Sequence, residues 1–225
     1  MHPGPDDPRV GPVRRAGDDL LAVAVADVVL AQALAARLRA TGDWLEAVAG
    51  MASVVAQFDP QAVDAGTAAD RLRDAAAGMP ARPRPAGEAI EISVVYGGEY
   101  GPDLAHVCEL TGLSEAAFVA RHTAAVHRVD LLGFTPGFAY LDAHPDFDVP
   151  RRAEPRPRVA AGAVGIANGR TGLYALPGPG GWHIVGRTPE RLFLPEARDP
   201  FRLAPGVAVR FRAMAPDEFE DRAGQ

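Results

Sequence analysis

The spacing of hydrophobic residues changes along the first part of the chain. Residues 20–26 form an almost unbroken apolar run, which predicts a buried strand. Leu30, Leu34 and Leu38 then recur at helical spacing ahead of Gly42, so we expect an amphipathic helix over residues 28–40. The same reading predicts a strand over 53–58, a helix that begins after Thr67 and ends at Gly78, and a strand over 90–96. We therefore expect residues 13–87 to form a small α/β domain of the split βαβ type.

Short apolar segments separated by glycine and proline follow His127. The best strand candidates are residues 129–134, 163–167, 172–175, 182–187 and 207–213. Several short strands at this spacing predict a barrel or a sandwich, preceded by two short helices that start near Pro102 and Ser114. The fold class is therefore α+β, with a β domain over residues 88–215. We expect a disordered lead-in over residues 1–12 and a frayed tail over 216–225.

The balance of charged residues excludes several classes of function. The chain has 225 residues and a net charge of −6, which argues against binding to nucleic acid or to an anionic membrane. All 23 basic residues are arginine, so this chain has no Walker lysine and no Schiff-base lysine.

Cys108 is the single cysteine, which rules out an intrachain disulfide and indicates a reducing compartment, the cytoplasm. The histidines show no paired metal-ligand spacing, so we expect no metal.

A stretch dense in glycine and proline, residues 131–188, organises the second half of the chain. Its aromatic and cationic residues stand beside glycine or proline, where rigid backbone holds their side chains. They are Phe134, Phe138, Arg151, Arg156, Trp182 and Arg187, and Tyr140 joins these candidates two residues after Phe138. Such positions suit recognition of a planar or anionic small molecule, and we expect these side chains to converge on one site. The alternative is an all-β domain whose turns simply need glycine and proline.

Charged side chains around this stretch are candidates for binding and proton transfer. The positive cluster consists of Arg151, Arg152, Arg156 and Arg158. It can capture a carboxylate or phosphate through parallel hydrogen bonds, or it can be a solvated loop. His122 is a candidate acid or base near neutral pH, or a hydrogen-bonded structural residue. Glu99, between glycines ahead of a helix, is a second candidate for proton transfer, whereas we expect Asp103 to cap that helix.

Motifs in this part of the chain resemble those of a known family. They are YGGEYGPDL (96–104), GFTPGFAYL (133–141), AGAVGIA (161–167), TGLY (171–174) and PGGWHIVGRT (179–188). In this order they resemble the family of the 5-oxoprolinase B subunit (PxpB), also called the KipI or allophanate hydrolase subunit one family. The resemblance implies a small N-terminal α/β domain followed by a cyclophilin-like β-barrel.

The same resemblance implies a heteromeric, ATP-dependent enzyme. Its partners would be the C subunit, which is a biotin-dependent carboxyltransferase-like protein, and a third 5-oxoprolinase subunit. Such complexes open 5-oxoproline, or here a related small lactam, to glutamate at the expense of ATP. The chain would be inactive alone, and its sequence identifies no ATP site. Some relatives inhibit a sensor histidine kinase, which is the alternative function.

Residue chemistry and position in the family together suggest a set of site residues. Catalytic candidates are His122 and Glu99, and substrate-binding candidates are Phe134, Pro136, Gly137, Tyr140, Arg156, Arg170, Thr171, Trp182 and Arg187. Three positions depart from the family pattern. Ala163 stands where a serine is usual, Arg170 where a glutamine is usual, and His127 where a tyrosine is usual. A guanidinium in place of an amide changes both charge and acceptor capacity, so the identity of the substrate depends on where Arg170 lies.

Overall fold

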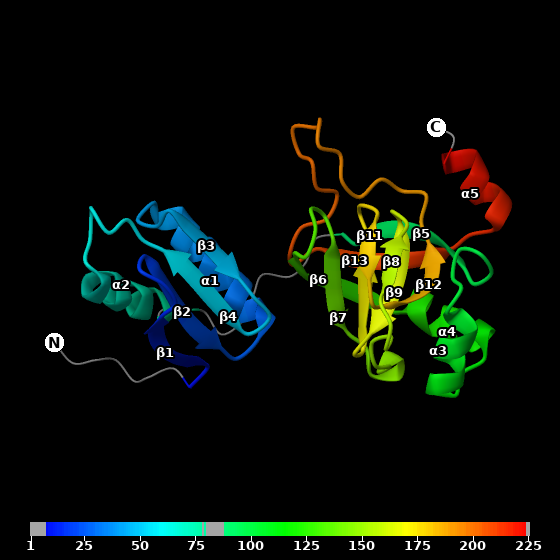
Figure 1. Ribbon diagram of the computed structural model, residues 1–225, viewed down its shortest axis with the longest axis horizontal. Coiled ribbons are helices and arrows are strands. Elements are labelled where there is room, and N and C mark those ends of the chain that lie inside the picture. The colour runs from blue at the N-terminus through cyan, green and yellow to red at the C-terminus, as the bar shows by residue number, and fades with distance from the viewer. Residues whose placement is uncertain (1–7, 78, 80–87, 224–225) are drawn as a thin grey trace. The chain divides into compact units, whose positions relative to one another are not determined.

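The computed structural model describes residues 8–77, 79 and 88–223 and divides the chain into two compact units (Figure 1). One unit comprises residues 1–85 and the other residues 86–225. Within the described ranges, no helix is long and apolar enough to cross a membrane.

The first unit is a split βαβ arrangement. Its described strands are β1 (Val10–Arg15), β2 (Leu20–Val25), β3 (Glu46–Ala49) and β4 (Ser53–Gln57), arranged in the antiparallel order β1-β2-β4-β3. Helix α1 (Val28–Thr41) connects β2 to β3, and β4 lies between these two parallel strands. Helix α2 (Ala65–Ala77) follows β4. The predicted split βαβ topology is therefore confirmed.

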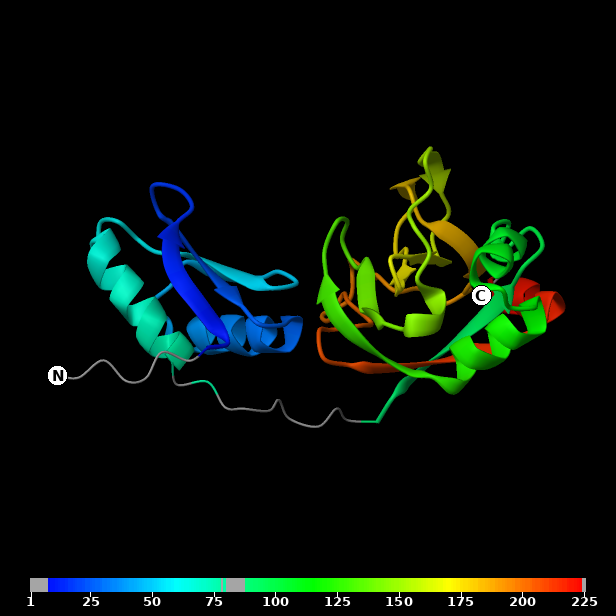
Figure 2. The same cartoon turned by 90° about the horizontal axis from the view of Figure 1, so that it is seen from below.

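The described residues of the first unit share one hydrophobic core. Alternate residues of β2, such as Leu21 and Val23, pack with Leu34 of α1 and Leu72 of α2. All four side chains are almost fully buried. Because one cluster contains residues of both helices, α1 and α2 cover the same face of the sheet (Figure 2). At this face, the side chains that alternate along the strands pack against those that recur every 3.6 residues along the helices.

Helix capping in the first unit agrees with the prediction for α1 and differs for α2. The Asp27 carboxylate accepts a hydrogen bond from the Leu30 amide, and Gly42 ends α1 with a φ of 75°. For α2 the cap is Asp64, whose carboxylate accepts from the Gly66 and Thr67 amides, so the helix begins at Ala65 and the prediction that it begins after Thr67 was wrong. The carboxylate also accepts from the Thr67 hydroxyl, and these hydrogen bonds lower the pKa of Asp64.

The ends of the chain correct two further expectations. Strand β1 begins at residue 10, so residues 10–12 belong to the sheet and not to a disordered lead-in. Residues 1–7 lie outside the described residues. At the other end, the expected frayed tail contains helix α5 (Pro216–Ala223). Phe219 on this helix is buried against Tyr100, with ring centroids 4.7 Å apart, which explains why the polar sequence is ordered.

The second unit is built on a closed β-barrel. The strands are β5 (Ile90–Tyr96), β6 (Val126–Leu132), β7 (Ala139–Ala143), β9 (Ala163–Ala167), β10 (Arg170–Leu173), β12 (His183–Arg187) and β13 (Ala208–Ala213). In the described chain they close in the order β10-β7-β6-β13-β5-β12-β9. Only the β13–β5 pair among them is parallel. The predicted barrel, and with it the α+β fold class, is confirmed.

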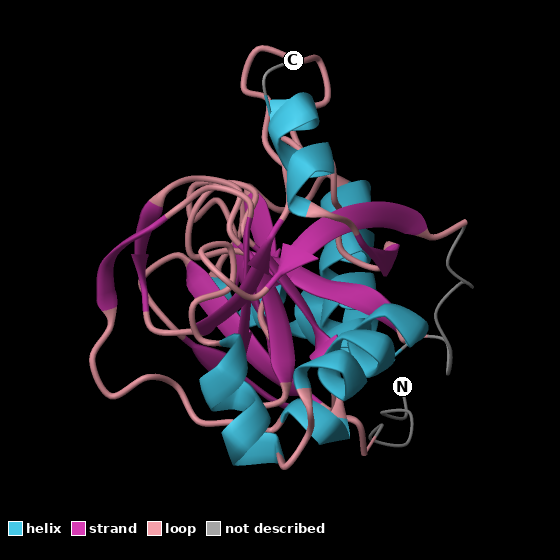
Figure 3. Cartoon of the chain, turned by 90° about the vertical axis from the view of Figure 1, so that its right-hand side faces the viewer, coloured by secondary structure: helices cyan, strands magenta, loops and turns pink. Residues whose placement is uncertain are grey.

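Helices cover one side of the barrel. Helix α3 (Leu104–Thr111) packs on β12, and α4 (Glu115–Ala124) packs on β13. The Ser114 hydroxyl accepts from the Ala117 amide and caps α4 as predicted. Figure 3 shows the C-terminal helix α5 at the edge of the strands. A short 3-10 helix (Pro145–Phe147) follows β7, and β8 (Arg156–Val159) pairs with β11 (Gly178–Gly180) in a separate small sheet.

Candidate functional site

A cluster of aromatic rings forms where β7, β10 and the segment before β12 meet. Phe138 lies at its centre and is 1% exposed. Its ring makes edge contacts with Phe134 at 5.5 Å, Tyr140 at 4.7 Å, Tyr174 at 4.8 Å and Trp182 at 5.9 Å between centroids. Edge-to-face contacts at these distances are favourable for aromatic pairs. We call these five side chains the aromatic cluster. It contains three of the predicted substrate-binding residues.

The turn between β6 and β7 presents Phe134 in an unusual conformation. Phe134 has a φ of 69°, which is rare for a bulky residue, and the residue is 60% exposed. Hydrogen bonds from the Thr135 amide to the Gly133 carbonyl and from the Phe138 amide to the Thr135 carbonyl hold the turn closed. A strained residue that keeps a large apolar ring in solvent is a candidate for ligand contact.

Gly137 must be glycine for two reasons. Its φ is 75°, and a Cβ atom there would lie 2.9 Å from the Cβ of Ala175 and 3.0 Å from that of Phe193. Gly172 is constrained by space alone, because its Cβ would lie 2.8 Å from both Phe138 and Trp182. Glycine therefore lets the backbone of β10 pass directly against the aromatic cluster.

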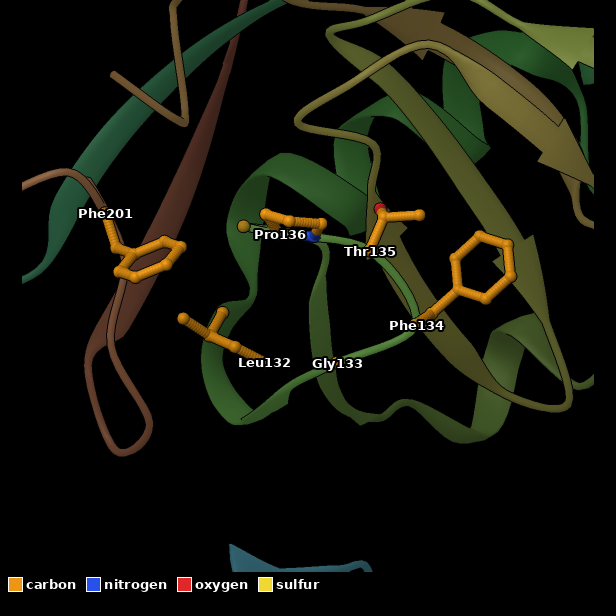
Figure 4. A pocket seen from close by; sticks show the side chains of 7 residues that line it. Leu132, Gly133, Phe134, Thr135, Pro136 and Phe201 are labelled. Atoms are coloured by element: carbon orange, nitrogen blue, oxygen red, sulfur yellow. The ribbon is translucent and has the colours of Figure 1, made fainter. Parts of the chain in front are cut away.

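The same turn lines an open pocket of about 400 Å³. It is formed by Leu132, Gly133, Phe134, Thr135, Pro136, Gly137 and Phe201. In Figure 4, Leu132, Pro136 and Phe201 group on one side of the turn, and the Phe134 ring lies on the other side. The predicted residues Pro136 and Gly137 thus border an apolar pocket, whereas Phe134 also reaches the aromatic cluster.

Arg156 is occupied by a protein carboxylate. Its two terminal nitrogens donate to Asp103 at 2.7 and 2.8 Å, and Arg152 donates to the same carboxylate at 2.9 Å. The Ile184 amide is a fourth donor, at 2.7 Å. Burial opposes ionisation of Asp103, but these hydrogen bonds and positive charges outweigh it and lower the pKa of the carboxyl. Asp103 stands before α3 without capping it, which corrects the predicted role.

The other two predicted arginines are also engaged within the unit. Arg170 forms an ion pair with the buried Asp130 and donates to the Leu141 carbonyl at 3.0 Å. Burial raises the pKa of Asp130 although Arg170 acts in the opposite direction. The Arg187 Nε donates to the Ala161 carbonyl at 2.9 Å, and its guanidinium lies over a ring of α5 at 5.5 Å. Neither guanidinium meets the aromatic cluster through these contacts.

His122 and Thr171 lie together in the barrel interior and not at a surface site. His122 is fully buried, with Nδ1 2.7 Å from the Tyr96 hydroxyl and Nε2 3.0 Å from the Thr171 hydroxyl. Burial, together with His127 and His144, lowers the pKa of His122 well below its ordinary value. The ring also stacks on Phe211 at 4.4 Å. This geometry supports a neutral, doubly hydrogen-bonded core histidine.

Glu99 is exposed on the turn between β5 and α3, and the described residues give it no hydrogen bond or ion pair. The two catalytic candidates, His122 and Glu99, therefore occupy different surroundings, one in the core and one in solvent. Within residues 8–77, 79 and 88–223, no three His, Cys, Asp or Glu side chains come together in a way that could hold a metal ion.

Comparison with known proteins gives the geometry a family context. The sequence model of one protein family, the carboxyltransferase domain, subdomains C and D, matches residues 13–203 of this chain. The chain belongs to this family. Three curated relatives, each named as the B subunit of 5-oxoprolinase, share 40–51% identity with it. The relative from Escherichia coli O157:H7 is 51% identical over 123 residues, which are 54% of this chain and 56% of the relative. The resemblance to the 5-oxoprolinase B-subunit family is confirmed, although the chain spans only about half the length of these relatives.

Solved structures of related proteins agree with the fold. TTHA0988 is 39% identical to this chain with a TM-score of 0.71, and the match covers 82% of this chain but 37% of that one. The urea amidolyase of Kluyveromyces lactis has a TM-score of 0.74 at 16% identity, covering 93% of this chain and 15% of the other. At this low identity, the similarity to the urea amidolyase shows a shared fold and nothing more.

The three residues that differ from the family pattern each have contacts within the barrel unit. Arg170 is neutralised by Asp130, as described above. His127 is 2% exposed, and its Nε2 lies 3.3 Å from the His122 carbonyl oxygen. Ala163 is 2% exposed and packs in the same hydrophobic cluster as the aromatic rings. None of these three side chains adds an unpaired charge to the candidate site.

Sequence reasoning missed the central role of Phe138 and Tyr174 and the pairing of Asp103. The sequence marks Phe138 only as an aromatic residue beside glycine, and Tyr174 only as part of a motif. Their burial at 1% and 2% follows from the approach of Gly172 and Gly180 from neighbouring strands. Asp103 pairs with arginines 49 and 53 residues further along the chain. No local signal indicates contacts of that range.

Proposed function

We propose that this chain is the B subunit of a 5-oxoprolinase-type system, which hydrolyses 5-oxoproline to glutamate at the expense of ATP. The observation that carries the proposal is the 51% identity to the 5-oxoprolinase B subunit of Escherichia coli O157:H7. A lactam is stabilised by amide resonance, so its hydrolysis benefits from an activating co-substrate such as ATP. The chain has no lysine for a Walker-type phosphate loop, which favours an ATP site on another subunit.

The candidate site supports a binding role for this chain. The exposed Phe134 ring and the partly buried Tyr140 ring can contact the faces of a small flat ring, and the Gly137 and Gly172 backbones permit close packing around them. His122 and Glu99 are too differently placed to act as an acid–base pair on one ligand. We therefore assign proton transfer to groups supplied by a partner and substrate contact to this chain.

The partner would be the carboxyltransferase-like subunit, with a third subunit completing the system. In TTHA0988 the region similar to this chain makes up only 37% of a longer polypeptide, which is consistent with a functional unit larger than this chain. The family description as subdomains C and D of a carboxyltransferase domain points the same way. A complex of separate subunits would supply what the longer chain holds covalently.

Reconstitution tests this function. The full chain is mixed with the candidate carboxyltransferase-like subunit and the third subunit, and glutamate release from 5-oxoproline is measured with and without ATP. We expect turnover only when all subunits and ATP are present, and none from this chain alone. Absence of turnover in the complete mixture, with 5-oxoproline or with related lactams, would refute the proposal. Capture of a sensor histidine kinase without the carboxyltransferase-like subunit in a pull-down would instead favour the alternative inhibitor function.

A further inference from the structure

The arginines near the candidate site differ in what they already bind. Arg152 and Arg156 share the carboxylate of Asp103, and Arg170 pairs with Asp130. A guanidinium that neutralises a buried carboxylate cannot take a ligand carboxylate without leaving that protein charge unpaired, which is strongly unfavourable. These arginines therefore stabilise the unit and are poor candidates for capturing a substrate anion.

Arg151, which lies next to the aromatic cluster, has no such partner among the described residues. It is exposed, and its Cζ lies 6.0 Å from the ring centroid of Trp182, at the outer limit of a cation–π contact. In the described part of the chain, its guanidinium makes no hydrogen bond or ion pair. The five N–H donors of the group are therefore available, while the indole limits the positions that it adopts.

Tyr140 supplies a second free donor beside the same indole. Its ring lies 5.8 Å from the Trp182 ring and 4.7 Å from the Phe138 ring. Among the described residues its hydroxyl has no hydrogen-bond partner. Burial raises the pKa of Tyr140, against the opposing effect of the Arg151 charge, so the phenol keeps its proton at neutral pH and can donate it in a hydrogen bond.

We propose that Arg151 and the Tyr140 hydroxyl form a carboxylate-binding site against the indole of Trp182. A planar guanidinium matches a carboxylate through two parallel hydrogen bonds, and the phenol can add a third. The aromatic cluster then contacts the apolar ring that carries the carboxylate. The inference rests on the proposed function and deepens it, because it assigns recognition of the 5-oxoproline carboxylate to a residue other than Arg156, Arg170 or Arg187.

Fluorescence titration tests this site directly. The sequence contains two tryptophans, so Trp44→Phe leaves Trp182 as the only reporter. The full chain in this background is titrated by fluorescence, and its complex with the partner subunits by calorimetry, with L-5-oxoproline and with 2-pyrrolidinone, which is the same ring without the carboxylate. We expect 5-oxoproline to bind more tightly. Arg151→Ala should weaken 5-oxoproline binding by about 10- to 100-fold and leave 2-pyrrolidinone binding unchanged.

Two further variants sharpen the result. Arg158→Ala is the matched control, because Arg158 is exposed, lies in the same segment and has no ion pair among the described residues; its titrations should equal those of the parent. Tyr140→Phe removes one neutral donor and should weaken 5-oxoproline binding by roughly 2- to 10-fold. Equal effects of Arg151→Ala and Arg158→Ala, or equal affinity for the two ligands, would overturn the carboxylate site.

The same titrations separate failure of this inference from failure of the proposed function. ATP-dependent turnover of 5-oxoproline that is indifferent to Arg151→Ala would leave the function standing and overturn the carboxylate site. Arg151-dependent binding of other small carboxylates, such as L-proline, with no binding of 5-oxoproline would support the carboxylate site and count against the function. No binding of any carboxylate, by the chain or by its complex, would overturn the site.

Discussion

Replacement of Asp103 by asparagine should destabilise the barrel unit strongly. Asp103 is 5% exposed, and its carboxylate accepts four hydrogen bonds, three of them from guanidinium groups. Asparagine keeps the volume and one acceptor oxygen but removes the negative charge and turns an NH₂ group toward donors. Arg152 and Arg156, whose side chains are 28% and 26% exposed, would lose their counter-charge.

The magnitude follows from the burial of this group. Removing one partner of a buried ion pair costs about 3–5 kcal/mol of unfolding free energy, because the remaining charge is left uncompensated. Since both guanidinium groups keep some access to water, we expect the lower end, about 3 kcal/mol. For a unit of this size, that loss corresponds to a fall in Tm of about 10 °C.

Urea unfolding followed by Trp182 fluorescence in the Trp44→Phe background measures this loss in the barrel unit. Asp146→Asn is the control, since its ion pair with Arg121 is exposed and should contribute less than about 1 kcal/mol. The pH dependence adds a second test. Because the folded-state pKa of Asp103 is lowered, its stabilisation is present above pH ~4 and is lost as pH falls through the folded pKa. A loss no greater than that of Asp146→Asn would refute the reasoning.

Three other predictions concern the core and the aromatic cluster. Thr171→Val should cost about 1–3 kcal/mol in urea unfolding, because it leaves Nε2 of buried His122 without a partner; an unchanged midpoint would contradict it. Burial lowers the folded-state pKa of His122, so the unfolded chain takes up the proton first as pH falls. The free energy of unfolding should therefore decrease below about pH 6.5. Urea midpoints that do not change with pH would argue for an accessible histidine. Gly172→Ala should cost about 1–3 kcal/mol and alter Trp182 emission, because its Cβ would lie 2.8 Å from that ring. Its control, Gly178→Ala, meets no atom within 4 Å and should stay within about 0.5 kcal/mol of the parent.

Local patterns in the sequence determined most of the elements of this protein. The leucine spacing of α1, the alternation in β4 and the capping residue Ser114 act over a few residues, so they can be read without knowledge of the fold. The motif around Gly137 likewise indicates a rigid turn, because proline and glycine restrict the backbone wherever they occur. Errors arose where local signals were weak, as in β1 and α5, whose order depends on neighbouring strands or on burial of Phe219.

Only the tertiary structure decided which charged side chains are free to bind a ligand. Arg151 and Arg156 look alike in the sequence, five residues apart in one proline-rich segment, yet Asp103 engages Arg156 and leaves Arg151 over the indole of Trp182. The same holds for His122, which the sequence offers as an acid or base and the barrel buries completely. Ion pairing and burial depend on residues tens of positions away, and only closure of the barrel brings those residues together.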